Sequence, residues 1–228
     1  QLLSTRNYRF GSRKIDLSVT FPSTDLPRLS IPRQDLDHYL WQQAAASSLA
    51  TLQSGQQMSI VQQSSDGIVL QGTDLKINTE LVINATGAQA VPFDDPALFV
   101  FSRQYYEGVQ TSGPRGLEVR YFYDPLPVCL FLCPMAGGRY NVELAIARAE
   151  YKRSGQRMED IWQGLLDSDP ELLGRFANAQ RVGRPKGTSL PLQSRRRWFT
   201  PGMIYAGSSA FTTNPITGLG VGNAMSMG

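Results

Sequence analysis

The chain has 228 residues and a mass of 25.2 kDa, which suffices for one large domain or for two interleaved ones. Apolar residues make up 41% of it and charged residues only 18%, a composition that excludes general disorder. The 22 Lys and Arg against 19 Asp and Glu leave a net charge of +3, too small to indicate a nucleic-acid partner. No apolar run approaches the roughly 18 residues that a membrane-spanning helix needs.

The cysteine and histidine content argues against a disulfide framework and against a metal site. Cys129 and Cys133 are the only cysteines, and on one strand they would lie roughly 13 Å apart, beyond the ~7 Å that a disulfide tolerates. The sole histidine, His38, falls in a predicted helix, where a surface or packing role is expected. The sequence begins without Met or a signal peptide and ends in a Gly-rich stretch, so we expect an interior piece of a longer protein.

The first half of the chain predicts short strands, one helix and one hairpin. Residues 1–31 alternate apolar and polar side chains between prolines, which is typical of strands and turns. From residue 33 to about 53 there is no Gly or Pro, and an apolar residue recurs every four positions, which predicts an amphipathic helix. Two β-like runs, 58–61 and 68–70, flank a turn and predict a hairpin. The apolar run 81–85 predicts a buried parallel strand.

The second half predicts a mostly antiparallel sheet and two helices. Gly and Pro clusters separate four β-like runs, which span 98–101, 117–123, 128–133 and 140–146. After Ser154, which we take as an N-cap, apolar residues from 158 to 166 follow helical spacing. Asp169 and Pro170 supply a cap and a first-turn proline for a second helix. Residues 203–206 predict one more short strand.

A Gly-rich segment after this last strand is the strongest local indication of a binding site. The strand leads into Gly207, and Asn214 and Pro215 precede the run T-G-L-G at 217–220, where a helix is expected to begin. Glycines and a helix N-terminus together bring backbone N–H groups close to an anion or to a polar ring edge. The segment is therefore expected to bind a ligand through its backbone, although Gly-rich turns of this kind also serve tight packing.

Five short motifs follow one another along nearly the whole chain from residue 31. They are R-Q-D-L-D-H-Y-L at 33–40, N-A-T-G-A at 84–88, R-Q-Y-Y-E-G at 103–108, G-S-S-A at 207–210 and N-P-I-T-G-L-G at 214–220. In this order they resemble the motifs of the geranylgeranyl reductase family of FAD-dependent oxidoreductases. That family belongs to a larger class with the para-hydroxybenzoate-hydroxylase-like monooxygenases and the flavin-dependent halogenases.

The resemblance implies an α/β fold, as an α+β mixture, in which an incomplete FAD- and NAD(P)-binding Rossmann-like domain is interleaved with a mostly antiparallel β-sheet substrate domain. Residues 32–90 and 199–228 would belong to the FAD-binding domain, and 91–198 would form the substrate-binding sheet with two helices. The strands of 1–31 are not assigned to either domain. The family's N-terminal G-x-G-x-x-G turn, which seats the ADP half of FAD, has no counterpart here, as expected of an interior piece.

The resemblance also implies FAD as the cofactor, with NAD(P)H as the candidate electron donor. Arg33, at the helix start, would lie near the FAD; Gly87 would contact the dinucleotide through its backbone; Gly207 and Ser208 would hold the ribityl chain. The turn that places N–H groups against the pyrimidine side of the flavin corresponds to Pro215, Thr217, Gly218 and Gly220. Ser208 replaces the family's aspartate, which should weaken binding because the charged acceptor is lost.

A substrate motif of the family is altered in this chain. Where the prenyl reductases carry Y-x-W-x-F-P and then G-x-G, alignment on Pro134 gives Cys129, Phe131 and Cys133 at the aromatic positions, and Glu143 and Ala145 at the glycines. The resemblance makes Phe131, Cys133 and Glu143 candidate substrate contacts. A carboxylate and two cysteines should change the polarity and volume of the pocket, which argues against a geranylgeranyl lipid. A role of this strand in core packing alone is equally compatible.

The leading interpretation is an FAD-dependent oxidoreductase that reduces double bonds of an isoprenoid or another apolar substrate. One alternative is an FAD-dependent monooxygenase or halogenase, in which reduced flavin reacts with O₂; another is a flavoprotein-like binding module without catalytic activity. No side chain can be named as acid, base or nucleophile. We expect a small apolar partner, no nucleic acid, and a cytoplasmic location with peripheral membrane contact if the substrate is a lipid. The sequence does not indicate an oligomeric state.

Overall fold

The structure, a computed structural model, describes residues 2–3, 5–11, 16–22, 28–64, 66–87, 99–111, 116–190 and 198–210. It forms two compact units that alternate along the sequence. Unit 1 comprises Gln1–Leu36 and Ala97–Ser189, and unit 2 comprises Asp37–Pro96 and Leu190–Gly228. Each unit is therefore assembled from segments that are distant in the sequence.

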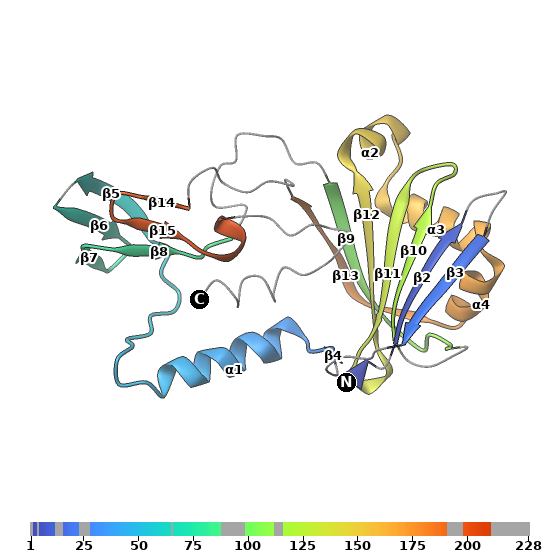
Figure 1. The fold of residues 1–228 in the computed structure, drawn as a ribbon, viewed down its shortest axis with the longest axis horizontal. Coiled ribbons are helices and arrows are strands. Elements are labelled where there is room, and N and C mark those ends of the chain that lie inside the picture. Colours follow the sequence, from blue (N-terminus) through green and yellow to red (C-terminus); the bar gives the residue numbers. More distant parts are fainter. Residues whose placement is uncertain are drawn as a thin grey trace. The chain divides into compact units, whose positions relative to one another are not determined.

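Unit 1 is built on a seven-stranded sheet (Figure 1). Its strands are β2 (Thr5–Gly11), β3 (Asp16–Pro22), β9 (Phe99–Glu107), β10 (Leu117–Phe122), β11 (Val128–Pro134), β12 (Tyr140–Ala147) and β13 (Gln180–Leu190). They lie in the order β13-β9-β12-β11-β10-β2-β3. Strand β2 runs parallel to β10. The neighbouring pairs β9–β12, β12–β11, β11–β10 and β2–β3 are antiparallel. Two short strands, β1 (Leu2–Leu3) and β4 (Arg28–Leu29), pair with each other.

The predicted antiparallel sheet is confirmed by β9, β10, β11 and β12, which correspond to the four β-like runs and are neighbours in the sheet. On β11 the side chains of Val128, Leu130 and Leu132 are buried, and those between them are half-buried. Because successive side chains of a strand point to opposite faces, these three residues define a core face. Strand β13 was not expected, since Gly183 and Pro185 interrupt its β-like pattern.

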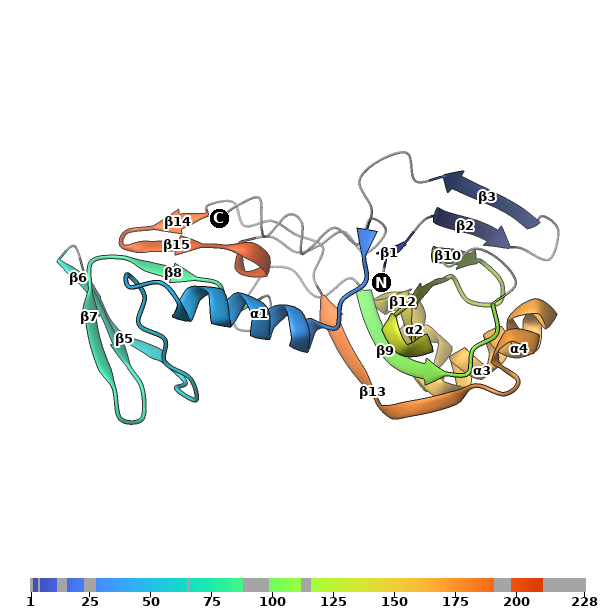
Figure 2. The ribbon, with the colours of Figure 1, turned by 90° about the horizontal axis from the view of Figure 1, so that it is seen from below.

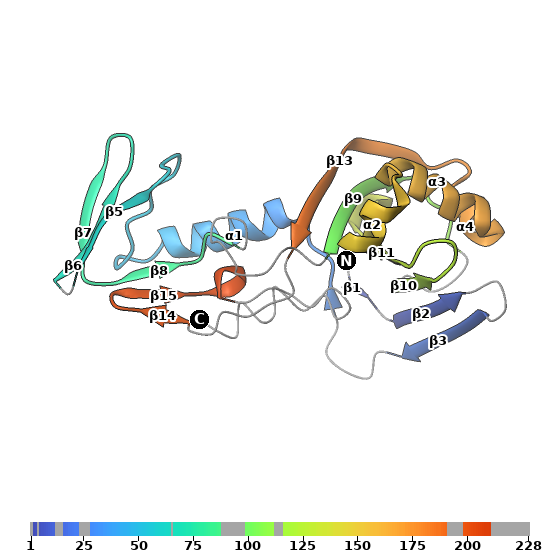
Figure 3. The same ribbon diagram turned by 90° about the horizontal axis from the view of Figure 1, so that it is seen from above.

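Two helices, α3 (Met158–Ser168) and α4 (Pro170–Phe176), lie against this core face (Figures 2 and 3). The apolar spacing predicted α3, and the cap at Asp169 with Pro170 predicted α4; both helices are confirmed. Their buried residues form one cluster with the core face; the helical members are Ile161, Trp162, Leu165, Leu166, Leu172 and Phe176. The rings of Trp162 and Phe176 meet edge to face with centroids 5.1 Å apart, a favourable aromatic geometry. Burial of this cluster holds the helices on the sheet.

The predicted role of Ser154 as an N-cap is wrong. Ser154 is the last residue of a further helix, α2 (Arg148–Ser154), and its hydroxyl donates to the carbonyl oxygen of Tyr151 at 2.8 Å. Helix α3 begins later, after Arg157, whose backbone N–H donates to the Asp160 carboxylate at 3.3 Å. A serine hydroxyl can cap the start of a helix or donate to a backbone carbonyl three or four residues earlier in a helix. Ser154 does the latter at the end of α2. A short 3₁₀ turn, Ala136–Gly138, joins β11 to β12.

The predicted start of α4 is confirmed, and it is tied to the sheet. Asp169 is the N-cap: its Oδ1 accepts from the backbone N–H of Leu172 at 3.1 Å, and Pro170 is the first helical residue. The other carboxylate oxygen of Asp169 accepts from Nη1 of Arg120, on β10, at 2.6 Å. One carboxylate therefore orders the helix terminus and fixes it to the sheet.

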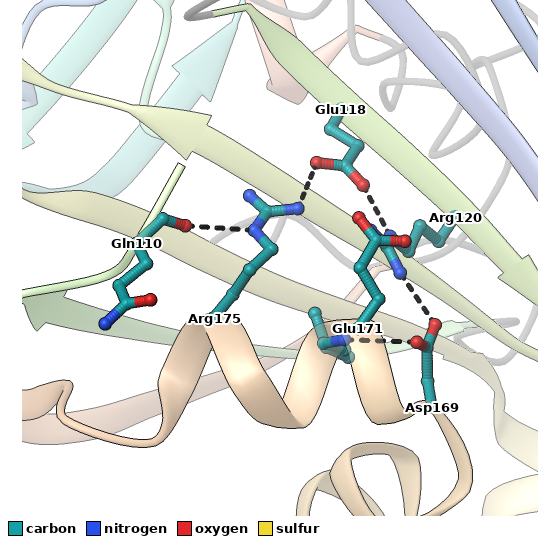
Figure 4. Close-up of polar contacts among 7 residues, drawn as sticks. Gln110, Glu118, Arg120, Asp169, Glu171 and Arg175 are labelled. Atoms are coloured by element: carbon teal, nitrogen blue, oxygen red, sulfur yellow. Dashed lines mark hydrogen bonds and ion pairs between the residues drawn. The ribbon is translucent and has the colours of Figure 1, made fainter. Parts of the chain in front are cut away.

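Arg120 is the centre of a buried ion-pair network (Figure 4). The residue is only 2% exposed, yet its guanidinium donates to Glu118 at 2.5 Å, to Asp169 and to Glu171 at 3.1 Å. Glu118 also accepts from Nη1 of Arg175, on α4, at 2.6 Å. Burial by itself lowers the pKa of Arg120, but the three carboxylates outweigh this effect and raise it. The charge is thus fully paired where it is buried.

Unit 2 contains two three-stranded sheets (Figure 1). Its strands are β5 (Ser59–Ser64), β6 (Gly67–Gln71), β7 (Lys76–Thr79), β8 (Val82–Asn84), β14 (Phe199–Thr200) and β15 (Met203–Tyr205). Strands β5, β6 and β7 form an antiparallel meander, and its first hairpin confirms the prediction. In the other sheet β15 pairs antiparallel with β14 and parallel with β8.

The two sheets of unit 2 pack through Ile68 on β6. This side chain is buried, and a Cβ atom built on Gly202 would lie 3.0 Å from its Cδ1. The side-chain amide of Gln63 donates to the carbonyl oxygen of Pro201 at 2.7 Å across the same contact. Strand β8 was predicted to be buried, and this is wrong for its centre: Ile83 is 65% exposed. Ile83 pairs with Ile204 of β15 and shares its sheet face. The buried side chain of Met203 lies on the other face of this sheet.

Helix α1 (Arg33–Ala45) begins where predicted but is shorter than the expected range 33–53. Beyond its end the N–H of Ser47 donates to the carbonyl of Ala44 at 3.1 Å, three residues back, and the Ser47 hydroxyl accepts from the N–H of Leu49 at 3.2 Å. Serine ends the helix because its hydroxyl competes for backbone groups. No residue of α1 is buried, so the predicted apolar stripe does not form a core face.

Candidate cofactor and substrate sites

Two loops of unit 2 begin at the same sheet edge. Strands β8 and β15 are parallel, with Asn84 beside Tyr205, so their carboxyl ends lie together. The loop 84–87 leaves the first strand there, and a 3₁₀ turn, η2 (Gly207–Ser209), follows the second. In open α/β sheets ligands bind outside the carboxyl ends of parallel strands. We name residues 84–87 and 207–209 the loop edge and treat it as the candidate cofactor site.

Ser209 holds the two loops of the loop edge together. Its side chain is fully buried, at 0% exposure, and its hydroxyl oxygen accepts from the N–H of Gly87 at 2.9 Å. The hydroxyl proton faces Oδ1 of Asn84 at 3.2 Å and the carbonyl oxygen of Gly87 at 3.3 Å. The same Oδ1 accepts from the N–H and hydroxyl of Thr86, so the first loop is also ordered internally. Sequence reasoning missed Ser209, whose only signal was the second serine of G-S-S-A.

The predicted cofactor residues Gly87, Gly207 and Ser208 all lie at the loop edge. Gly87 and Gly207 have φ angles of +92° and +56°, which favour glycine. A Cβ atom built on Gly87 would meet nothing within 4 Å, so a ligand can approach this backbone closely. Ser208 is exposed, with its hydroxyl available to a ligand, and Ser209 is the member that orders the loops.

The remaining predicted cofactor residues lie in the other unit or outside the described part of the chain. Arg33 is exposed at the start of α1 and belongs to unit 1, whereas the loop edge belongs to unit 2. Pro215, Thr217, Gly218 and Gly220 lie outside the described residues. Their roles at the flavin stay predictions.

The predicted substrate residues share one face of the unit 1 sheet. Phe131 on β11 lies directly opposite Glu143 on β12, and Cys133 lies opposite Asn141. On the other side of β12, Arg103 of β9 lies opposite Glu143. Directly paired residues of antiparallel strands point to the same face. We name this the second face, since it is opposite the core face. It includes Arg103, Tyr105, Cys129, Phe131, Cys133, Asn141 and Glu143, together with Phe101, Val119, Tyr121 and Ala145.

Glu143 is a half-buried acid on the second face. Burial raises the pKa of its carboxyl group above the ordinary value of 4.5, and the positive charge of Arg103 lowers it by less. Arg103 in turn lies over the ring of Tyr105, 5.6 Å from its centroid. Among the described residues the carboxyl group of Glu143 forms no hydrogen bond and no ion pair within 4 Å. The face thus carries an acid that its own neighbours leave without a donor.

The raised pKa of Glu143 makes its stability contribution depend on pH. The folded chain binds this proton more tightly than the unfolded chain, so stability falls as the pH rises from about 4.5 through the raised pKa. We expect Glu143→Gln to gain unfolding free energy relative to the parent at about pH 8 and to lose that gain near pH 4. Urea unfolding of parent and variant at pH 8 and at pH 4 measures this difference in unfolding free energy. The control is Glu80→Gln, at an exposed acid of unit 2. An equal gain in unfolding free energy at pH 8 and at pH 4 would contradict the raised pKa of Glu143.

Both cysteines are free, as the sequence predicted for a pair on one strand, and both are half-buried on the second face rather than in the core. Burial raises the pKa of Cys129 to about 12 and also raises that of Cys133; nearby Glu143 adds to both shifts. At pH 8 about one Cys129 in ten thousand would then be a thiolate. We expect Ellman's reagent to react at least about a hundredfold more slowly with the folded chain than with the chain in urea. Equal reaction rates for the folded chain and the chain in urea would contradict the burial of the two thiols.

Two further features bear on the function classes. Among the residues that the structure describes, no three His, Cys, Asp or Glu side chains are grouped so as to hold a metal ion, and His38 is exposed on α1. Within the same ranges no helix combines the length and the apolar character needed to cross a membrane.

Comparisons with known proteins identify the class of fold. No protein-family model matches the sequence, and no curated protein sequence is significantly similar to it. The flavin-dependent brominase Bmp2 superposes with a TM-score of 0.80 at 16% identity, over 99% of this chain and 60% of the brominase. The myxobacterial chondrochloren halogenase CndH, an FAD-dependent halogenase, superposes with a TM-score of 0.78 at 16% identity, over 97% of this chain and 56% of the halogenase. A variant of the halogenase PltM in complex with FAD superposes with a TM-score of 0.82 at 11% identity, over 99% of this chain and 51% of PltM.

The chain therefore has the fold of flavin-dependent halogenases, and it spans 60% or less of the length of these three proteins. The expected fold class, an α+β mixture with mostly antiparallel sheets in a flavoprotein arrangement, is confirmed. The finer assignment to the geranylgeranyl reductases stays a prediction.

Proposed function

We propose that this chain is part of an FAD-dependent oxidoreductase, and that its chemistry is that of a halogenase or monooxygenase rather than that of an isoprenoid reductase. The observation that carries the proposal is the match of 97% or more of the chain to the fold of FAD-dependent halogenases, with TM-scores of 0.78 or above. The half-buried carboxyl group of Glu143 on the second face supports halogenase or monooxygenase chemistry, since an isoprenoid offers such an acid no hydrogen-bond partner.

In this proposal the loop edge binds part of the FAD. Gly87 and Gly207 admit the cofactor to the backbone, and the Ser208 hydroxyl hydrogen-bonds a ribityl hydroxyl. Ser209 positions both loops without touching the cofactor. The flavin would supply the redox chemistry, with NAD(P)H as the proposed source of electrons, and the protein would supply binding, orientation and electrostatics.

The second face is the proposed substrate side of the enzyme. Phe131 and Cys133 offer apolar surface, and Glu143 offers a carboxyl group whose pKa is raised by burial. This set suits a substrate that is neither wholly apolar nor charged. Cysteines in place of larger aromatic rings leave room for it.

The test is the visible absorbance spectrum of the protein expressed from its complete reading frame, before and after incubation with FAD. We expect flavin bands that stay with the protein through gel filtration, and NAD(P)H oxidation that consumes O₂ without reducing an isoprenoid alkene. A colourless protein that never takes up FAD would exclude the oxidoreductase and favour a binding module without catalytic activity. Alkene reduction without O₂ uptake would favour the reductase instead.

A further inference from the structure

The β5–β6–β7 meander of unit 2 (Figure 1) carries a cavity of about 430 Å³ that the proposed function does not use. Small-molecule sites in proteins commonly span about 300–1,000 Å³, so the cavity is large enough for an organic molecule. No residue of the loop edge lines it. We name it the meander cavity; the side chains that matter here are those of Gln62, Ser64, Asp66, Val69, Asn78 and Glu80.

Strand register places one wall of the meander cavity. Gln62 lies opposite Val69, and Val69 lies opposite Asn78, so these three side chains form one row across a single sheet face. Gln63 and Ile68 belong to the alternate row, which contacts the other sheet of unit 2. The row of Gln62 therefore faces away from that contact and is accessible to a ligand.

Gly67 leaves a gap beside this row. It lies opposite Ser64 with a φ of +142°, and a Cβ atom built on it would lie 2.9 Å from the carbonyl oxygen of Thr79. This close approach excludes a side chain. Because Thr79 pairs with Ile68, the next residue of the chain, Glu80, comes level with Gly67. The gap thus lies between Ser64 and Glu80.

The lining of the meander cavity is acidic. Asp66 and Glu80 carry carboxyl groups, and no described residue of the lining is a lysine, an arginine or a histidine. Both acids are exposed, and neighbouring strands lie only about 5 Å apart, so one ligand can reach both. The side-chain amides of Gln62 and Asn78 add acceptor oxygens. Charge complementarity therefore favours a cation that carries several N–H donors.

An organic cation suits this lining better than a metal ion does. Within the described ranges no three His, Cys, Asp or Glu side chains are grouped so as to hold a metal ion, and the volume is that of a molecule with several atoms. A guanidinium group pairs with a carboxylate through two parallel hydrogen bonds and has further N–H groups for amide oxygens. Val69, half-buried in the middle of the row, offers apolar surface to an alkyl chain.

We propose that the meander cavity binds a small organic cation, with a guanidinium or ammonium group on an alkyl chain. Asp66 and Glu80 pair with the positive charge, the amides of Gln62 and Asn78 accept its remaining N–H groups, and Val69 contacts the alkyl chain. This binding site is a function of the chain beyond the flavin chemistry proposed above.

The experiment compares butylguanidinium with N-butylurea, which has nearly the same shape but no charge. Each compound is titrated into the full chain, and backbone amide chemical shifts are followed by NMR. We expect butylguanidinium to shift amides of β5, β6 and β7 at millimolar concentration and to bind at least about fivefold more tightly than butylurea. Raising the NaCl concentration from about 20 mM to about 500 mM should weaken its binding about threefold or more.

Three variants and a matched control test the residues. Asp66→Asn and Glu80→Gln should each weaken butylguanidinium about fivefold and leave butylurea unchanged. Asn78→Lys places a fixed cation in the meander cavity and should weaken butylguanidinium at least about tenfold. Asp74→Asn removes an exposed carboxylate between β6 and β7, outside the lining, and should leave both affinities unchanged.

Three results would overturn the proposal: no shifts on the three strands, equal affinity for the two compounds, or an equal loss of affinity with Asp74→Asn. If one acid variant does not fold, the other and Asn78→Lys still carry the test. The measurement involves no flavin, so its result is independent of whether the protein takes up FAD.

Discussion

Replacing Arg120 by Met should lower the free energy of unfolding by about 3–5 kcal/mol, the usual cost of removing one partner of a buried ion pair. The methionine fills much of the volume but leaves Asp169 and Glu118 close together without the cation between them (Figure 4). It also removes the tie between the N-cap of α4 and β10. Since domains are stable by only about 5–15 kcal/mol, the loss should be large in urea unfolding followed by circular dichroism.

The matched control is Arg139→Met. Arg139 donates to Glu107 at 2.7 Å, much like the pairs of Arg120, but the two side chains are 51% and 49% exposed. Exposed pairs contribute about 0–1 kcal/mol, because water and salt screen them. Similar losses for the two variants would show that burial does not determine the value of the Arg120 network.

Replacing Ser209 by Ala should disorder the loop edge. The change removes the acceptor of the Gly87 N–H and the hydroxyl that joins this loop to Asn84. We expect a loss of about 1–3 kcal/mol in unfolding free energy, the cost of a buried polar group left unpaired. If FAD binds as proposed, its affinity should fall about tenfold or more, because the backbone of Gly87 is no longer held in place. Flavin fluorescence titration and urea unfolding measure the two effects.

Ser208→Ala is the control for this prediction. Ser208 is exposed, so its removal should change stability by no more than about 0.5 kcal/mol. A loss of FAD affinity without a loss of stability would support direct contact with the ribityl chain. If the Ser208 variant were less stable than the Ser209 variant, the bridging role of Ser209 would be wrong.

Local patterns sufficed for much of the fold of unit 1. The spacing of apolar residues placed α3, and Asp169 with Pro170 placed the start of α4, because capping involves groups within about four residues of one another. The same holds for the hairpin of β5 and β6, whose turn requires a glycine at Gly67. Strand β11 was evident from its apolar composition alone.

Other features could not be predicted because their partners are distant in sequence. Nothing in the run 117–123 marks Arg120 as buried, because the Asp169 carboxylate that pairs with its charge lies 49 residues away. Ser209 bonds to Gly87 across 122 residues. The exposure of Ile83 has the same origin, since an apolar run does not reveal which face of its sheet another element covers.

The sequence by itself determined the class of elements, the order of the motifs and the positions of the glycines at the loop edge, since propensity, caps and turns act between near neighbours. The tertiary structure alone decided that β8 and β15 run side by side, which brings Ser209 to Gly87. It also decided that Asn141 and Glu143 share a face with Phe131 and Cys133. Strand register is set by long-range pairing, and a shift of one residue would turn each of these side chains to the core face.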